Sequence, residues 1–255
     1  MGKSIKLVLI YLLMQIIAAI ISVLIATFIY GIDVEALQTF TLVSTLFISM
    51  VGMTIYLYRS GEIPTGKNTW SPISLLYVIL SLLAGLCCIV LVDFVTTGLN
   101  WLPDWTDTTF DQVLSTGMGV LGVALFGPVL EELLFRGAVT RILLQQYSPA
   151  KAIVFSALIF GIFHINPAQI AGATLIGLFL AWIYYRTESL IPCILVHVLN
   201  NSLAVGMDRR FPEAQTLAEL MSPSVYYMLI SASMVIFALC LFAMNRQTAP
   251  NKIKH

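Results

Sequence analysis

Charged residues are scarce in this 255-residue chain: only 10% are Asp, Glu, Lys or Arg, whereas 59% are hydrophobic, and the mean hydropathy is +0.93. Soluble domains contain about 25% charged residues, so a soluble protein is excluded. The 13 basic and 13 acidic residues give a formal net charge of zero, which removes the electrostatic basis for a nucleic-acid partner. Each remaining charge is therefore informative through its position.

Long apolar runs indicate a polytopic membrane protein. A bilayer core about 30 Å thick needs about 20 apolar residues per helix, and the runs lack the alternation typical of outer-membrane barrel strands. There is no evident repeat, low-complexity tract or soluble linker domain, so we predict an all-α fold with one polytopic domain over 1–255. Transmembrane helices are expected at about eight places, namely residues 7–30, 36–58, 72–98, 115–145, 151–166, 168–185, 189–206 and 224–244.

Most Lys and Arg residues fall on one side of this topology. With eight alternating spans, the side that holds the N-terminus receives all basic residues except Arg209 and Arg210. The positive-inside rule then favours cytoplasmic termini, and we expect a multi-pass protein of a bacterial plasma membrane. The residues assigned to the cytoplasmic side are Lys3, Lys6, Arg59, Lys67, Arg136, Arg141, Lys151, Arg186, Arg246, Lys252 and Lys254.

Two adjacent acids, Glu131 and Glu132, interrupt the fourth apolar run. Placing a carboxylate near the middle of a transmembrane helix costs at least about 2.5 kcal/mol of insertion free energy. Such residues therefore face protein or water, and by default they mark a functional site. Arg136 follows Glu132 at i+4, the favoured spacing and order for an ion pair. Glu131 points about 100° away, so we expect a paired Glu132 and a freer Glu131. Gly127-Pro128, one turn earlier, is expected to break or kink the helix.

Two histidines also lie in predicted spans. His164 ends the run Phe160-Gly-Ile-Phe-His164, and His197 shares a helix face with Asn201 at i+4. A lone histidine would be interpreted as an interhelical hydrogen bond. Together with the acids and Arg136, these side chains predict one polar cluster in the bundle interior, at compatible depths in the core segment 115–206.

This set of side chains suits hydrolysis of an amide by water. A carboxylate in a partly dry cavity can act as a general base, and imidazole and amide N–H groups can stabilise a developing oxyanion. Cys193, one turn before His197, leaves a thiol nucleophile as a lesser alternative. The sequence has no His-Glu-x-x-His, but Glu131, His164 and His197 could bind a metal such as zinc. We favour a mechanism without a cofactor and leave zinc open.

At these residues the sequence resembles the CAAX-processing and bacteriocin-processing (CPBP, also called Abi) intramembrane proteases. Three motifs of that family occur here in the family's order. They are Glu-Glu-x-x-x-Arg, Phe-x-x-x-His and His-x-x-x-Asn, and in this chain they read Glu131-Glu132-Leu-Leu-Phe-Arg136, Phe160-Gly-Ile-Phe-His164 and His197-Val-Leu-Asn-Asn201. The N-terminal third and the last span carry no comparable signature.

The resemblance implies an eight-helix endopeptidase. It assigns Glu131 as the general base toward water and His164 as the residue that positions that water. It further implies that His197 and Asn201 stabilise the oxyanion and that Arg136 supports the acidic pair. The expected substrate is a peptide or a membrane-associated protein. A proton-coupled transporter and a non-catalytic bacteriocin immunity protein of the same fold remain alternatives.

Overall fold

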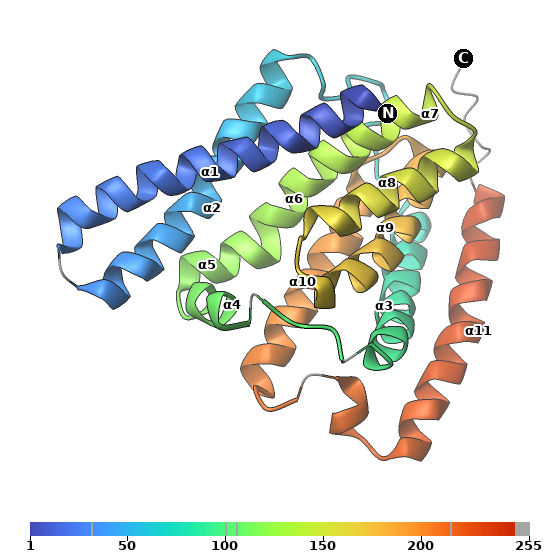
Figure 1. Cartoon of the computed structure of the whole chain (residues 1–255). Coiled ribbons are helices and arrows are strands. Elements are labelled where there is room, and N and C mark those ends of the chain that lie inside the picture. The colour runs from blue at the N-terminus through green and yellow to red at the C-terminus, as the bar shows by residue number, and fades with distance from the viewer. Residues whose placement is uncertain (32, 100, 106, 215, 248–255) are drawn as a thin grey trace.

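The computed structural model of the chain is a bundle of helices (Figure 1), and it describes residues 1–31, 33–99, 101–105, 107–214 and 216–247. Within these ranges there is no β-strand, so the all-α prediction is confirmed. The long helices are α1 (Gly2–Tyr30), α2 (Val34–Arg59), α3 (Leu75–Thr97), α9 (Pro167–Thr187), α10 (Ile191–Arg210) and α11 (Pro223–Gln247). The shorter elements are α4 (Asp107–Leu114), α5 (Gly117–Leu121), η1 (Gly122–Phe126), α6 (Gly127–Glu132), η2 (Leu133–Thr140), α7 (Arg141–Leu144), α8 (Pro149–Phe163) and η3 (Leu217–Leu220).

Seven of the described helical segments are long and apolar enough to cross a membrane, with the continuous run Gly117–Leu144 counted as one. The remaining expected span, 151–166, corresponds to the 15-residue helix α8. At 1.5 Å per residue α8 is about 22 Å long, which is short of the 30 Å hydrocarbon core. His164 therefore lies at the end of a short helix and not within a full span.

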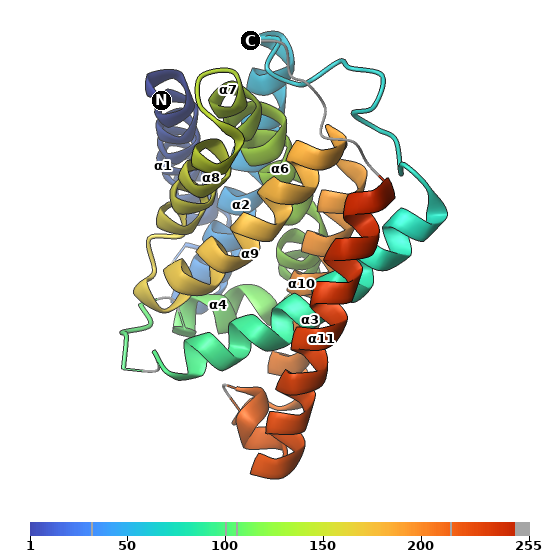
Figure 2. The same ribbon diagram turned by 90° about the vertical axis from the view of Figure 1, so that its right-hand side faces the viewer.

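The start of α1 and the end of α11 lie at the same end of the bundle, as both ribbon views show (Figures 1 and 2). At that end the amino group of Met1 donates to the Gln146 side chain, and the Ser74 hydroxyl donates to the Gln247 side chain at 3.2 Å. This arrangement needs an even number of crossings, whereas the candidate spans among the described residues number seven; the short helix α8 provides the additional, incomplete crossing. A cytoplasmic position for this end stays a prediction.

The structure changes the expected placement of one basic residue and leaves two others undescribed. Arg136 is fully buried in the bundle, so it was wrongly counted among the residues of the cytoplasmic connections. Its charge is neutralised inside the protein and contributes nothing to the positive-inside bias. Lys252 and Lys254 lie outside the described residues.

The run Gly117–Leu144 passes through the middle of the bundle (Figure 1) and contains two π-helical segments, η1 and η2. The helix is not broken at Gly127-Pro128, and the chain widens into i→i−5 turns just before the proline. The Gly127 N–H bonds to the Gly122 carbonyl in this wider register. Pro128 lacks an N–H, so the next carbonyl in the register, that of Val123, needs another donor. π-Bulges of this kind occur frequently at functional sites.

Helices α8 and α9 pack closely because glycine faces the contact. A Cβ atom at Gly161 would overlap the Thr174 hydroxyl and lie 2.8 Å from the Ile170 carbonyl oxygen. A Cβ at Gly177 would lie 3.0 Å from the Phe160 ring. This close approach places Phe160 and the end of α8 beside α9.

We predict that Gly161→Ala destabilises the protein by about 1–3 kcal/mol, the usual cost of overpacking a filled contact. The matched control is Gly206→Ala, also within a helix, where a Cβ meets nothing within 4 Å. Thermal unfolding of both variants in detergent micelles measures the difference. An equal melting temperature for the two variants would show that α8 and α9 can separate without cost.

Candidate active site

The centre of the site is a fully buried ion pair between Glu132 and Arg136. The Arg136 Nη1 atom donates to Glu132 Oε1 at 2.9 Å, and both side chains have zero exposure. His197 Nδ1 contacts the same carboxylate oxygen at 2.7 Å. Two buried charges at this depth are tolerated because each is the other's partner, and removing one leaves the other uncompensated.

Arg136 also connects three helical segments. Its Nη2 atom donates to the Gly177 carbonyl of α9 at 3.4 Å, and its guanidinium lies 4.4 Å from the centroid of the Phe160 ring of α8. A cation over an aromatic face is attracted by the ring quadrupole, more strongly where water is excluded. Arg136 in η2 therefore holds α8 and α9 in place around the acidic pair.

Glu131 differs from its neighbour in exposure and in partners. Its side chain is 19% exposed, and Oε2 lies 3.7 Å from His197 Nε2, which is longer than a normal hydrogen bond. His197 thus faces both acids, with Nδ1 on Glu132 and Nε2 toward Glu131. Glu132 is buried and bonded through Oε1, whereas Glu131 is partly exposed.

Asn201 lies one turn beyond His197 on α10. Its Nδ2 group donates to the Val123 carbonyl at 3.0 Å. This is the carbonyl to which Pro128, without an N–H, cannot donate. Its Oδ1 accepts from Asn200 at 3.0 Å. An amide nitrogen carries two hydrogens, so the bond to Val123 orients the group and leaves a second donor. Pro128 in α6 and Asn201 in α10 are thus linked through the Val123 carbonyl.

His164 is half-buried at the C-terminal end of α8. Its Nδ1 lies 2.9 Å from the Phe160 carbonyl oxygen; a carbonyl only accepts, so Nδ1 donates and a neutral ring has its lone pair at Nε2. In the described part of the chain, no hydrogen bond or ion pair joins His164 to Glu131 or His197. The Phe160 ring connects the two histidines instead, with centroid distances of 4.9 Å to His164 and 5.7 Å to His197.

The three side chains named for a metal, Glu131, His164 and His197, do not form a metal-binding group. Among the described residues, no set of three or more His, Cys, Asp or Glu side chains is placed to hold an ion. Glu131 and His197 are close enough to share one, but His164 contributes no third ligand in this arrangement. Cys193, the lesser nucleophile candidate, is completely buried, and its thiol lies 3.5 Å from the carbonyl oxygens of Leu180 and Ser189.

Sequence reasoning missed Tyr11. It comes from α1, is 3% exposed and stacks on Phe163 with a centroid distance of 5.4 Å. Phe163 in turn lies beside His164, with a centroid distance of 5.9 Å, so Tyr11 packs against the end of α8 next to the site. A tyrosine in an apolar first span, more than 100 positions before the motifs, gives no signal in the sequence.

Asp93 was also overlooked, although an acid inside the predicted span 72–98 is a visible signal. Its carboxylate accepts from the Leu217 N–H at 3.0 Å and from the Tyr226 hydroxyl at 2.8 Å. These bonds join α3 to η3 and to the start of α11. Asp93 is therefore a structural acid, away from the cluster around Glu132.

Comparisons with known proteins agree with the motifs. The family model for type II CAAX prenyl endopeptidase Rce1-like proteins matches residues 114–203, the segment that contains all three motifs. This match confirms the resemblance to the CPBP family.

One curated relative is the Bacillus subtilis (strain 168) protein named "Putative membrane peptidase YdiL", which is 25% identical over 116 residues. The alignment covers 46% of this chain and 48% of that relative, so the chain matches about half of the relative's length. No solved structure gives a significant match to this chain.

We predict that Arg136→Gln destabilises the protein by about 3–5 kcal/mol, because it leaves the Glu132 carboxylate buried without its cation. The double variant Glu132→Gln/Arg136→Gln removes both charges and should recover most of that loss. Unfolding of the two single variants and the double variant in detergent measures the coupling. Additive losses would contradict a coupled pair.

Proposed function

We propose that the chain is a membrane endopeptidase that hydrolyses a peptide bond with a water molecule activated by Glu131. The observation that carries this proposal is the contrast between two adjacent acids: Glu132 is buried and fixed, whereas Glu131 is partly exposed beside His197. A general base needs access to water and freedom to take up a proton. Glu131 has both, and its buried neighbours keep it in position.

In the proposed reaction, Glu131 removes a proton from water as the water oxygen attacks the peptide carbonyl carbon. The carbonyl becomes a tetrahedral oxyanion, and the C–N bond then breaks. The departing nitrogen takes the proton from Glu131, which yields a carboxylic acid and an amine, and proton transfer between these products gives a carboxylate and an ammonium. The lone pair at His164 Nε2 accepts a hydrogen bond from the attacking water and fixes its orientation.

Oxyanion stabilisation is assigned to His197 and Asn201. In its doubly protonated form His197 donates through Nδ1 to Glu132 and through Nε2 toward the reaction centre. The second hydrogen of the Asn201 amide provides another donor from the same helix face. Donors that are already oriented stabilise a developing negative charge without reorganisation. Arg136 supports this arrangement through Glu132 and is a positioning residue.

The proposed substrate is a peptide or a membrane-associated protein segment. The matching family model is named for type II CAAX prenyl endopeptidases, but since we expect the chain to be bacterial, we propose a substrate that is not prenylated. We propose that the reaction needs no metal, since Glu131 and the two histidines supply the base, the water contact and the oxyanion donors.

Glu131→Gln is predicted to lower the rate of peptide cleavage by at least about a hundredfold, because it removes the general base while it keeps the side-chain size. The assay is hydrolysis of a membrane-associated peptide library by the purified full-length chain in liposomes. Glu35→Gln, at an exposed acid in the first turn of α2, is the matched control. Retained cleavage in Glu131→Gln would refute the assignment, and proton flux without cleavage in the parent would identify a transporter instead.

Metal independence gives a separate prediction. Treatment of the active protein with a zinc chelator, followed by its removal, should leave the cleavage rate unchanged within experimental error. Loss of activity that added zinc restores would overturn the metal-free mechanism. That result would leave the peptidase assignment intact, since the Glu131→Gln experiment tests it independently.

A further inference from the structure

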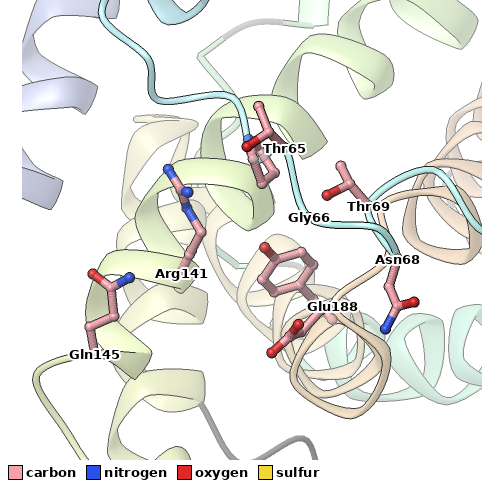
Figure 3. A pocket seen from close by; sticks show the side chains of 9 residues that line it. Thr65, Gly66, Asn68, Thr69, Arg141, Gln145 and Glu188 are labelled. Atoms are coloured by element: carbon pink, nitrogen blue, oxygen red, sulfur yellow. The ribbon is translucent and has the colours of Figure 1, made fainter. Parts of the chain in front are cut away.

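A second polar site lies at the end of the bundle that holds Met1 and Gln247. It is a cavity of about 210 Å³ between the loop 64–69 and the ends of α7 and α9. Figure 3 shows Arg141 and Gln145 on one side of the cavity, Glu188 below and the loop residues on the other side. None of its lining residues belongs to the three motifs, so the cavity is separate from the candidate active site.

The cavity is preformed because its loop is attached on both sides. Arg141 Nη2 donates to the Glu62 carbonyl at 2.8 Å, just before the loop. The Leu190 N–H donates to the Thr69 carbonyl at 2.8 Å at the loop's other end. Gly137 lies close beneath, and a Cβ atom there would be 3.2 Å from Pro64. The loop therefore forms a rigid wall.

Several polar side chains line this cavity without hydrogen bonds or ion pairs to one another in the described part of the chain. Arg141 contacts Glu62 through Nη2 alone, and its Nε atom has no hydrogen-bond partner. In the described ranges the Glu188 carboxylate, the Tyr184 hydroxyl and the Gln145 amide have no hydrogen-bond or ion-pair partner, and Arg141 forms no ion pair with Glu188. Arg141, whose Nη2 atom also lies 3.8 Å from the Glu62 carboxylate, and Glu188 thus line the same space without pairing with each other.

The backbone at Glu188 adds an independent observation. Its φ angle is 52°, in the left-handed region at the end of α9. Glycine or asparagine is usual at such a position, and another side chain there costs about 1 kcal/mol or more. A glutamate held in this conformation presents a carboxylate to the cavity at the expense of backbone stability, which is typical of a functional position.

The depth of the cavity restricts what it can bind. α2 ends at Arg59, α9 ends at Thr187 and α10 begins at Ile191, so for helices that span the bilayer the cavity lies in the headgroup layer. Its volume is below the range of about 300–1,000 Å³ that larger ligands occupy. We propose that the cavity binds the zwitterionic headgroup of phosphatidylethanolamine, with the phosphate on Arg141 and the primary ammonium on Glu188.

The headgroup chemistry makes a discriminating test. A primary ammonium donates three hydrogen bonds, whereas the quaternary ammonium of phosphatidylcholine donates none. We expect the full-length chain in detergent to bind dioleoyl phosphatidylethanolamine about tenfold more tightly than the phosphatidylcholine analogue, the size of one charge-assisted hydrogen bond at a partly exposed site. Native mass spectrometry of the lipid adducts measures both affinities.

Glu188→Gln should remove this preference without weakening phosphatidylglycerol binding, because only the partner of the ammonium is lost and an anionic lipid is no longer repelled. Gln145→Ala, at an exposed lining residue, is a second variant that should weaken phosphatidylethanolamine binding without altering the fold. Lys151→Gln, at an exposed cation near this end but outside the cavity lining, is the control and should retain the preference. Equal binding of both lipids by the parent, or a preference that survives Glu188→Gln, would overturn the proposal.

Free phosphoethanolamine distinguishes the two sources of this chemistry. If the lipid is the ligand, the soluble compound should not displace it at equal concentration, because the acyl chains add affinity. Displacement at equal concentration would show that a soluble zwitterion occupies the site and would overturn the assignment to lipid. Both results are independent of peptide cleavage, so they are unaffected if the proposed function fails.

Discussion

The structure depends on the burial of one guanidinium. Taking Arg136 and Glu132 out of water costs several kcal/mol per ion, and only close pairing with further polar contacts repays it. The contacts come from four segments: Glu132 in α6, Gly177 in α9, His197 in α10 and the Phe160 ring in α8. Satisfying this buried ion pair therefore requires these helices to come together in a single arrangement, and that arrangement creates the site.

Pro128 explains the irregular turn in the central run Gly117–Leu144. An unbroken α-helix with Pro128 in it would lose a hydrogen bond and clash with the preceding turn. The wider turn of η1 just before Pro128 relieves the clash, and it leaves the Val123 carbonyl to be bonded by Asn201. Proline in the membrane is tolerated where a neighbouring helix satisfies the freed group. Here that group is the Asn201 amide, which is itself a candidate oxyanion donor. The hydrogen bond that satisfies the Val123 carbonyl therefore also orients a side chain of the site.

Much of the fold could be predicted from the sequence because each long helix is an apolar run of membrane length. The Glu132–Arg136 pair could also be predicted, since i and i+4 contacts depend only on local helical geometry. The π-helical turns could not, because propensity and periodicity describe regular helices and the register change depends on packing around Pro128. The roles of Phe160 and Tyr11 were also out of reach, since both depend on contacts between helices far apart in sequence.

The two glutamates illustrate how position alone can divide two identical groups. Adjacent residues on a helix point in directions about 100° apart, so at the surface of the central run one faces the packed core and the other faces the open side. The core-facing acid must be paired, and the pairing fixes His197 by its Nδ1 atom. Because the ring is planar and held at one nitrogen, its Nε2 atom is then aimed toward Glu131. The buried acid thus orients, through a shared histidine, the groups around the acid that remains free to react.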